Sequence, residues 1–215
     1  MFEDCSVIKI EGYVALFDIL GFGNLVRNND LAKVFETYKK CKDAFEENFH
    51  TINALFERDA IIFQLFSDPF LIYIKGVSDD DFLILLVVCD FLFEAAIVNN
   101  LPIRGAIIVG DLTVGGDVVF GKPIIDAYEM EQQQKWIGCW ISDGCVQKVG
   151  NWEGHVERKS VSRMVMSENC RNDFEVQEVV EKVRFSGVRS ENPNVRVKYD
   201  NMNRFMDSVL TEEYL

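Results

Sequence analysis

One short apolar stretch, residues 14–23, constrains the fold of this chain more than any other segment. Asp18 is its only charged residue, and Gly21 and Gly23 lie at its end. An apolar run of this length bounded by glycines is typical of a buried strand. A carboxylate inside such a strand loses hydration free energy unless a cation or hydrogen-bond donors replace the water. Asp18 therefore marks a candidate binding site.

A second stretch, residues 61–74, has the same pattern, because Asp68 is the one carboxylate in a largely apolar, β-rich sequence. The alternative for each aspartate is an ordinary capping or turn residue. Both nevertheless lie near the turns of core strands, and carboxylate oxygens are the ligands that Mg²⁺ and Mn²⁺ prefer. Asp18 and Asp68 together predict one divalent-metal site.

Composition narrows the function classes. The chain has 215 residues, enough for one domain with a sizeable core. Its net charge of −13 argues against nucleic acid, because proteins that bind phosphate backbones usually carry a basic face. The N-terminus lacks the basic and apolar regions of a secretory signal, and the apolar windows are too short or too charged for a bilayer span. We expect a soluble, cytoplasmic protein without membrane or nucleic-acid partners.

Cysteine and histidine spacing gives no zinc motif. There is no Cys-x-x-Cys pair, and the two histidines, His50 and His155, stand alone. We expect reduced thiols, several of them in the core, rather than disulfides. The cysteines are at positions 5, 41, 89, 139, 145 and 170.

The order of the apolar patterns predicts an α+β fold. Helical spacing extends over residues 30–53, and the acidic run at 78–81 is interpreted as the capped start of a helix through residue 99. The short connection between strands at 60–65 and 70–74 predicts an antiparallel hairpin. Other expected elements are strands at 6–18, 103–109, 118–121 and 136–142, a helix at 123–134, and a glycine-rich turn at 110–117. This order predicts a ferredoxin-like (split βαβ) antiparallel sheet with helices on one face.

The chain becomes more polar after about residue 150. We expect a strand at 156–165, a helix or loop at 173–182 and a helix at 201–210. No repeat or low-complexity linker separates this part. The prediction is one domain over residues 1–215, with a core at about 7–150 and a C-terminal extension at 151–215.

Several segments resemble class III nucleotidyl cyclases, and more closely the stand-alone pyrimidine cyclases of bacterial anti-phage (Pycsar-type) systems. The segment FDILGF at 17–22 is similar to the first metal-aspartate motif, and FSD at 66–68 to the second. Residues 103–106 and 121–131 are similar to the strand and helix that follow in the stand-alone group. The resemblance covers about residues 12–145, with a weaker similarity at 197–199.

This resemblance implies a cyclase that converts UTP or CTP to 3′,5′-cyclic UMP or CMP and pyrophosphate. Asp18 and Asp68 would hold two Mn²⁺ or Mg²⁺ ions, which stabilise the attacking and leaving oxygens. The carbonyl of Ile19 would be a further metal ligand. Backbone N–H groups of Ile19, Leu20, Gly21 and Phe22 would hold the triphosphate. The resemblance also implies a homodimer, a role as signal synthase in anti-phage defence, and a separate effector protein that senses the product.

Departures from the cyclase pattern bear on specificity. Gln64 takes the place of the purine-selecting lysine or glutamate, and the partner acid of the base pocket falls near Val118. The side chains that usually select a purine base are therefore missing. The sequence does not decide between uracil and cytosine.

The helix after Gly121 also differs from the cyclase pattern. Ile125 and Glu129 take the places of its asparagine and arginine, and an acidic side chain cannot stabilise developing negative charge. Arg104 is the candidate replacement cation; the alternative is a strand residue paired to a surface carboxylate. We expect Tyr128, Glu129 and Glu131 on a solvated helix face.

Two other functions stay open. One is a catalytically impaired, cyclase-like dimer that binds nucleotide or a partner protein. The other is a metal-dependent phosphoryl-transfer enzyme that releases a linear product.

Overall fold

The computed structural model describes residues 8–56, 61–65, 69–115, 118–135, 137–149 and a few positions between 193 and 204. The strands and the longer helices follow one another in the order that the apolar pattern predicts. The elements are β1 (Ile8–Ile19), α1 (Phe22–Asn28), α2 (Leu31–Phe56), β2 (Ile61–Leu65), β3 (Phe70–Lys75), α3 (Asp79–Val98), β4 (Ile103–Gly115), β5 (Val118–Phe120), α4 (Lys122–Gln132), β6 (Gly138–Ile141) and α5 (Asp143–Lys148).

One sheet organises these elements, with strand order β2-β3-β1-β4-β5. The pairs β2–β3, β3–β1 and β1–β4 are all antiparallel, and β6 adds to β4 in parallel. The first four strands and their two long helices form the predicted split βαβ arrangement, which confirms the α+β fold class. β1 lies at the centre and pairs with β4 along its whole length, from Ile8 opposite Val114 to Ile19 opposite Ile103.

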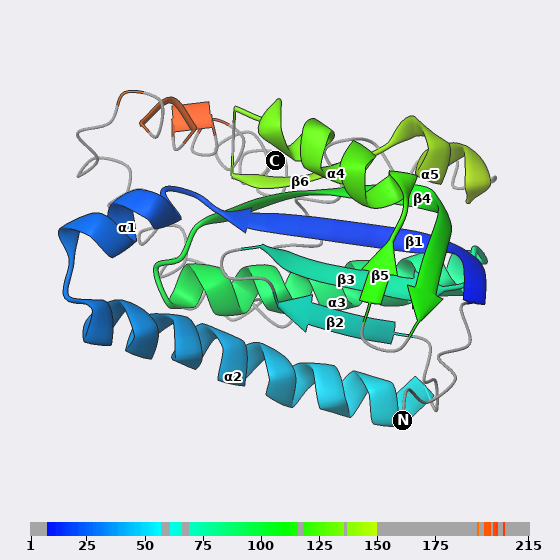
Figure 1. Cartoon of the computed structure of the whole chain (residues 1–215), viewed down its shortest axis with the longest axis horizontal. Coiled ribbons are helices and arrows are strands. Elements are labelled where there is room, and N and C mark those ends of the chain that lie inside the picture. The colour runs from blue at the N-terminus through cyan, green and yellow to red at the C-terminus, as the bar shows by residue number, and fades with distance from the viewer. Residues whose placement is uncertain are drawn as a thin grey trace, which may run out of the picture.

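Helices cover both faces of the sheet (Figure 1). α2 and α3 pack on the face of Tyr13, Ala15 and Phe17, as the prediction of helices on one face requires. α4 packs on the opposite face, against Val14 and Leu16, which the prediction did not include. The reason lies in β1, where residues 13–17 are all buried. A strand with no polar face needs cover on both sides.

The predicted caps and helix spacing are largely confirmed. Ser78 accepts a hydrogen bond from the Asp81 N–H while the Asp81 carboxylate accepts one from the Ser78 N–H, so the acidic run forms a capping box at the start of α3. On α2, however, Leu31 and Phe35 are 62% and 67% exposed. The apolar stripe that covers the sheet is therefore narrower than the sequence spacing indicates.

β4 corrects the predicted turn at 110–117. It continues as a strand to Gly115 because β1 begins early enough, at Ile8, to pair with it. The short helices α1 and α5 were also not predicted. The expected elements at 156–165 and 173–182 lie outside the described residues, whereas residues 196–198 and Asn201 are helical.

At two positions the structure explains why the residue is glycine. A Cβ at Gly105 in β4 would collide with the Phe17 ring and the Leu16 carbonyl, so glycine lets β1 and β4 approach closely. Gly21 has φ of +77°, a left-handed conformation that side chains with a Cβ rarely adopt, and it caps the start of α1.

Cys41, Cys89, Cys139 and Cys145 are buried and carry no disulfide, as predicted for them. Burial raises the pKa of the Cys41 thiol to about 12, so it stays protonated at neutral pH. Among the described helices, none has the length and apolar character needed to cross a membrane.

Candidate functional site

Asp18 and Arg104 lie directly opposite each other near the ends of the central strands. Their Cα atoms are register partners in the β1–β4 ladder, on the face covered by α4. Arg104 Nη2 lies 3.7 Å from Asp18 Oδ2. The Asp18 side chain is 27% exposed and that of Arg104 only 8%. The strand therefore presents the Asp18 carboxylate at a partly open edge, with a buried cation beside it.

The guanidinium of Arg104 has partners on α4 as well. Its Nε contacts the Glu131 carboxylate, and its Nη1 donates to the Gln134 carbonyl oxygen at 3.2 Å. Gln134 in turn donates from its amide to the Gly105 carbonyl. These contacts join the C-terminal end of α4 to β4. The geometry favours the paired-strand interpretation of Arg104, but its closest carboxylate is buried rather than on the surface.

Glu131 is the residue that sequence analysis placed wrongly. It is fully buried, because it follows Ala127 by one helical turn on the side of α4 that faces the sheet. Burial raises its pKa to about 7, against the opposing effect of Arg104. Tyr128 and Glu129 are exposed, as predicted. The sequence signal for this burial was the helical spacing, which places Glu131 one turn after Ala127 on the same side of the helix.

Lys198 is a further cation of this site that the sequence indicated only weakly. It is half-buried in the helical residues 196–198. Burial and the Arg104 charge lower its pKa, whereas Glu131 and Asp18 act in the opposite direction. Nearby, the Asn201 amide donates to the Lys135 carbonyl at 2.7 Å, just after α4. The C-terminal part of the chain therefore adds a positive charge that interacts electrostatically with Asp18, Glu131 and Arg104.

The loop after β1 positions the predicted triphosphate-binding amides. Ile19 is buried and ends the strand, and the Leu20 N–H donates to the Pro102 carbonyl at 2.8 Å. That amide is therefore already used within the fold. Gly21 and Phe22 begin α1, where the first N–H groups of a helix have no acceptor inside it. They are the better candidates to bind a phosphate oxygen.

Gln64 and Val118 also lie on described strands. Gln64 is half-buried in β2, opposite Leu71, which belongs to the apolar cluster on the α4 face. Gln64 is thus on the same face of the sheet as Asp18 and roughly 10 Å away from β1, at two strand spacings. Val118 is 56% exposed at the start of β5. No hydrogen-bonding side chain stands at this second position.

Asp68 lies outside the described residues, in the connection between β2 and β3. Among the residues that the structure does describe, no group of three or more His, Cys, Asp or Glu side chains gathers into a metal site. Asp18 fits a hard divalent cation in its chemistry, since it offers a partly exposed anionic oxygen. The second carboxylate would have to come from Asp68.

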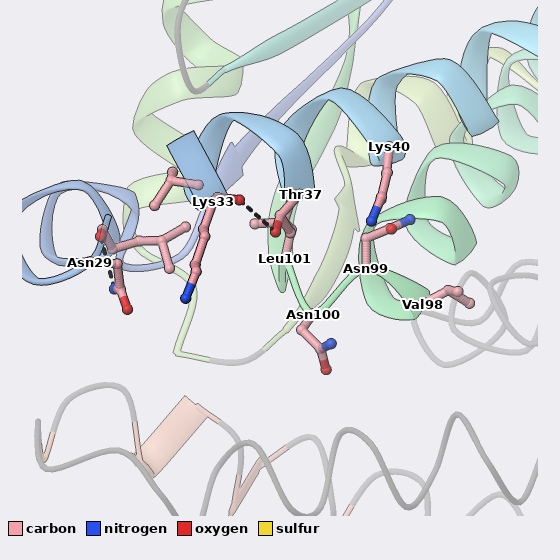
Figure 2. Close-up of a pocket in the computed structure, with 10 residues that line it drawn as sticks. Asn29, Lys33, Thr37, Lys40, Val98, Asn99, Asn100 and Leu101 are labelled. Carbon is pink, nitrogen blue, oxygen red and sulfur yellow. Dashed lines mark hydrogen bonds between the residues drawn. The ribbon is translucent and has the colours of Figure 1, made fainter. Parts of the chain in front are cut away.

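A separate pocket of about 380 Å³ lies between α2 and the turn that joins α3 to β4 (Figure 2). Lys33, Thr37 and Lys40 line it from α2, and Asn99 and Asn100 from the turn. None of the candidate residues predicted from the sequence contributes to its lining. This pocket is therefore distinct from the Asp18 site.

Comparisons with known proteins define the fold class. No family model and no curated protein matches the sequence. The structure is similar to that of the adenylyl cyclase CyaB from P. aeruginosa, with a TM-score of 0.56 and 15% identity over 72% of this chain and 90% of that one. The catalytic core of a rhodopsin-guanylyl cyclase with converted specificity, in complex with ATPαS, gives a TM-score of 0.51 and 18% identity over 70% of this chain and 86% of that one.

A third similar structure is a class III adenylyl cyclase-like ATP-binding protein from Pseudomonas aeruginosa. Its TM-score is 0.53, with 10% identity over 99% of this chain and 47% of that one. The chain therefore has a class III cyclase-like fold. At these identities, the comparison shows the fold alone.

Proposed function

We propose that this chain is a nucleotidyl cyclase that converts UTP or CTP to the 3′,5′-cyclic monophosphate and pyrophosphate, as a signal synthase in bacterial anti-phage defence. The observation that carries the proposal is Asp18. It is a partly exposed carboxylate at the end of the central strand of a class III cyclase-like sheet, where the sequence resembles the first metal-aspartate motif. The role in defence follows from the resemblance to the stand-alone group.

The covalent chain supports a shared site for Asp18 and Asp68. Phe70 pairs with Phe17, the residue before Asp18, and Asp68 precedes Phe70 by two positions. Two Cα–Cα steps span at most about 7.6 Å. Both carboxylates can therefore reach one divalent-cation site.

Each residue of the proposed site has a task. Asp18 and Asp68, with the Ile19 carbonyl, would hold Mn²⁺ or Mg²⁺, which supplies charge stabilisation at the attacking and leaving oxygens. The amides of Gly21 and Phe22 would orient the triphosphate at the start of α1. Lys198 would offset phosphate charge, since Arg104 is already bound by Glu131 and Gln134.

Pyrimidine specificity rests on what the base pocket offers. Gln64 carries both a donor and an acceptor on its amide, so it can hydrogen-bond either uracil or cytosine. Val118 offers no polar side chain where the resemblance places the partner acid of purine cyclases. These two residues support UTP or CTP over ATP and GTP.

The proposal includes a homodimer. β5 and α4 are consecutive in the chain and expose Val118, Phe120, Ile125 and Tyr128, each between 55% and 59%. Neighbouring exposed apolar side chains of this size often mark protein interfaces. A second copy of this chain is the proposed partner, and sedimentation would report a dimer whose affinity falls when Phe120 is replaced by glutamate.

A catalytically impaired nucleotide-binding dimer is the second candidate. It is favoured by the burial of Arg104 and by the exposed Glu129 where cyclases carry an arginine. One of the similar structures is itself described as cyclase-like and ATP-binding. Nucleotide binding without pyrophosphate release would support this candidate.

Product analysis tests the proposal. The full chain is incubated with Mn²⁺ and each of UTP, CTP, ATP and GTP, and products are identified by mass spectrometry. We expect cyclic UMP or cyclic CMP, and none from an Asp68→Ala variant. A linear product would indicate another phosphoryl-transfer reaction, and no product from any triphosphate would reject the cyclase proposal.

A further inference from the structure

Two carboxylates share Arg104 unequally. Its Nε directly contacts Glu131, whereas its Nη2 lies 3.7 Å from Asp18. The Glu131 side chain is fully buried, and that of Asp18 is 27% exposed. Coulomb attraction strengthens as charges approach and as water is excluded. Glu131 is therefore the dominant partner of the guanidinium.

The end of α4 adds to this pull. Arg104 Nη1 donates to the Gln134 carbonyl at 3.2 Å, just beyond the last turn of the helix. A backbone carbonyl oxygen is a hydrogen-bond acceptor, and a bond to a charged donor is stronger than one to a neutral donor. Gln134 is fixed in place by its own bond to the Gly105 carbonyl. Both groups draw Arg104 toward α4 and away from the carboxylate on β1.

We infer that Glu131 is a positioning residue that holds Arg104 back from Asp18, so that the guanidinium competes less with a divalent cation for the Asp18 carboxylate. The inference rests on the proposed function for the cation site at Asp18. Guanidinium groups and divalent cations compete for the same carboxylate oxygens, because the N–H fork of an arginine can occupy both of them.

Loss of the Glu131 charge would redirect Arg104. A buried cation without its partner is strongly unfavourable. Among the described carboxylates that contact Arg104, only Asp18 would then remain. Arg104 would close on Asp18, and a cation would have to displace it to bind.

Direct measurement of Mn²⁺ binding tests this inference. Free Mn²⁺ is followed by electron paramagnetic resonance in solutions of the full chain, without nucleotide, at pH 8.5. Glu131→Gln should weaken binding by about 10–100-fold, the usual effect of removing a residue that orients a metal ligand. The double variant Glu131→Gln/Arg104→Gln should recover most of the lost affinity, because no guanidinium then competes for Asp18.

Glu129→Gln is the matched control. It removes one negative charge from the exposed side of the same helix without touching Arg104, so Mn²⁺ affinity should stay at the wild-type value. Circular dichroism verifies that each variant is folded. Should Glu131→Gln not fold, Arg104→Gln alone is decisive, because removal of the competitor must not weaken Mn²⁺ binding.

Unchanged affinity in Glu131→Gln would overturn the inference. A double variant as weak as the single one would overturn it too, since Glu131 would then act only by supporting the fold. A wild-type chain that binds Mn²⁺ but forms no cyclic product contradicts the proposed cyclase and leaves this inference standing. Failure of the wild-type chain to bind Mn²⁺ would overturn both.

Discussion

The two faces of the sheet differ in where their ion pairs lie, although Asp90 of α3 is also buried. On the α2–α3 face, Phe17, Phe45 and Phe82 are fully buried, and the ion pairs of α2 join side chains that are exposed or partly exposed. On the α4 face the apolar cluster is smaller, and Arg104 and Glu131 lie between the helix and the sheet.

This difference suggests that one face of the sheet mainly stabilises the fold, whereas the other carries the candidate site. Apolar burial stabilises a fold in proportion to the area removed from water, so the α2–α3 face carries most of the folding free energy. Buried ion pairs contribute little net stability, because desolvation offsets their attraction. Charges retained inside the α4 face therefore need a reason other than stability.

Asp18→Asn should have the largest effect. If Asp18 holds a catalytic cation, its neutral isostere should lower cyclase turnover by about 10⁴-fold, which corresponds to about 5 kcal/mol of barrier. The free energy of unfolding should hardly change, since Arg104 keeps Glu131. Initial rates with Mn²⁺ and urea unfolding measure the two quantities. Retained turnover would show that Asp18 is not a catalytic metal ligand. A large loss of stability would show that charges on the α4 face also stabilise the fold.

Phe82→Ala tests the other face. Phe82 in α3 is fully buried, and its ring centroid lies 5.0 Å from that of Tyr13. Such a deletion typically costs about 3–5 kcal/mol. Ile124→Ala, at a partly buried position of α4, should cost only about 1 kcal/mol by the smaller area it exposes. Urea unfolding measures the free energy of unfolding of both variants, provided that the m-value is the same as in the wild type. Equal costs would mean that both faces contribute alike to stability.

The elements that the sequence predicted well are those with local signals. The 3.6-residue spacing of α2, the apolar run of β1 and the cap of α3 each lie within one segment. β4 was predicted too short, because its extension depends on a distant partner, residues 8–12 of β1. A turn-like glycine sequence is overridden when a neighbouring strand offers a full ladder of hydrogen bonds.

The site was predictable to the same limited extent. Asp18 became a candidate because a charge in an apolar strand is anomalous, and Arg104 because its segment resembles one in the cyclases. Glu131 and Lys198 were not assigned, because their burial results from packing between segments far apart in the chain. An acidic residue on a mixed helix looks solvated until the face that meets the sheet is known.

The free energy of unfolding should depend on pH through the titration of the Glu131 carboxyl group. Its pKa is about 7 in the folded chain, above the ordinary value of 4.5. Between these two values the folded state binds more protons than the unfolded state, so the free energy of unfolding should fall as pH rises through this window. We expect a decrease on the order of 2 kcal/mol.

Glu131→Gln should flatten this part of the profile, whereas Glu129→Gln, exposed on the same helix, should preserve it. Urea unfolding at several values between pH 5 and pH 8 gives both curves. Parallel curves for wild type and Glu131→Gln would show that the buried carboxyl does not titrate in this range.

Asp43→Asn should have the smallest effect. Lys39 Nζ and Asp43 Oδ2 are 2.5 Å apart, but their side chains are 58% and 53% exposed on the outer surface of α2. Exposed pairs one helical turn apart contribute about 0.3–0.5 kcal/mol, and salt screens them. Unfolding at low and high salt should therefore show a small loss that disappears as ionic strength rises. A loss above about 1 kcal/mol that survives high salt would mean that the charges outside α2 stabilise the fold, and the contrast between the two faces would no longer hold.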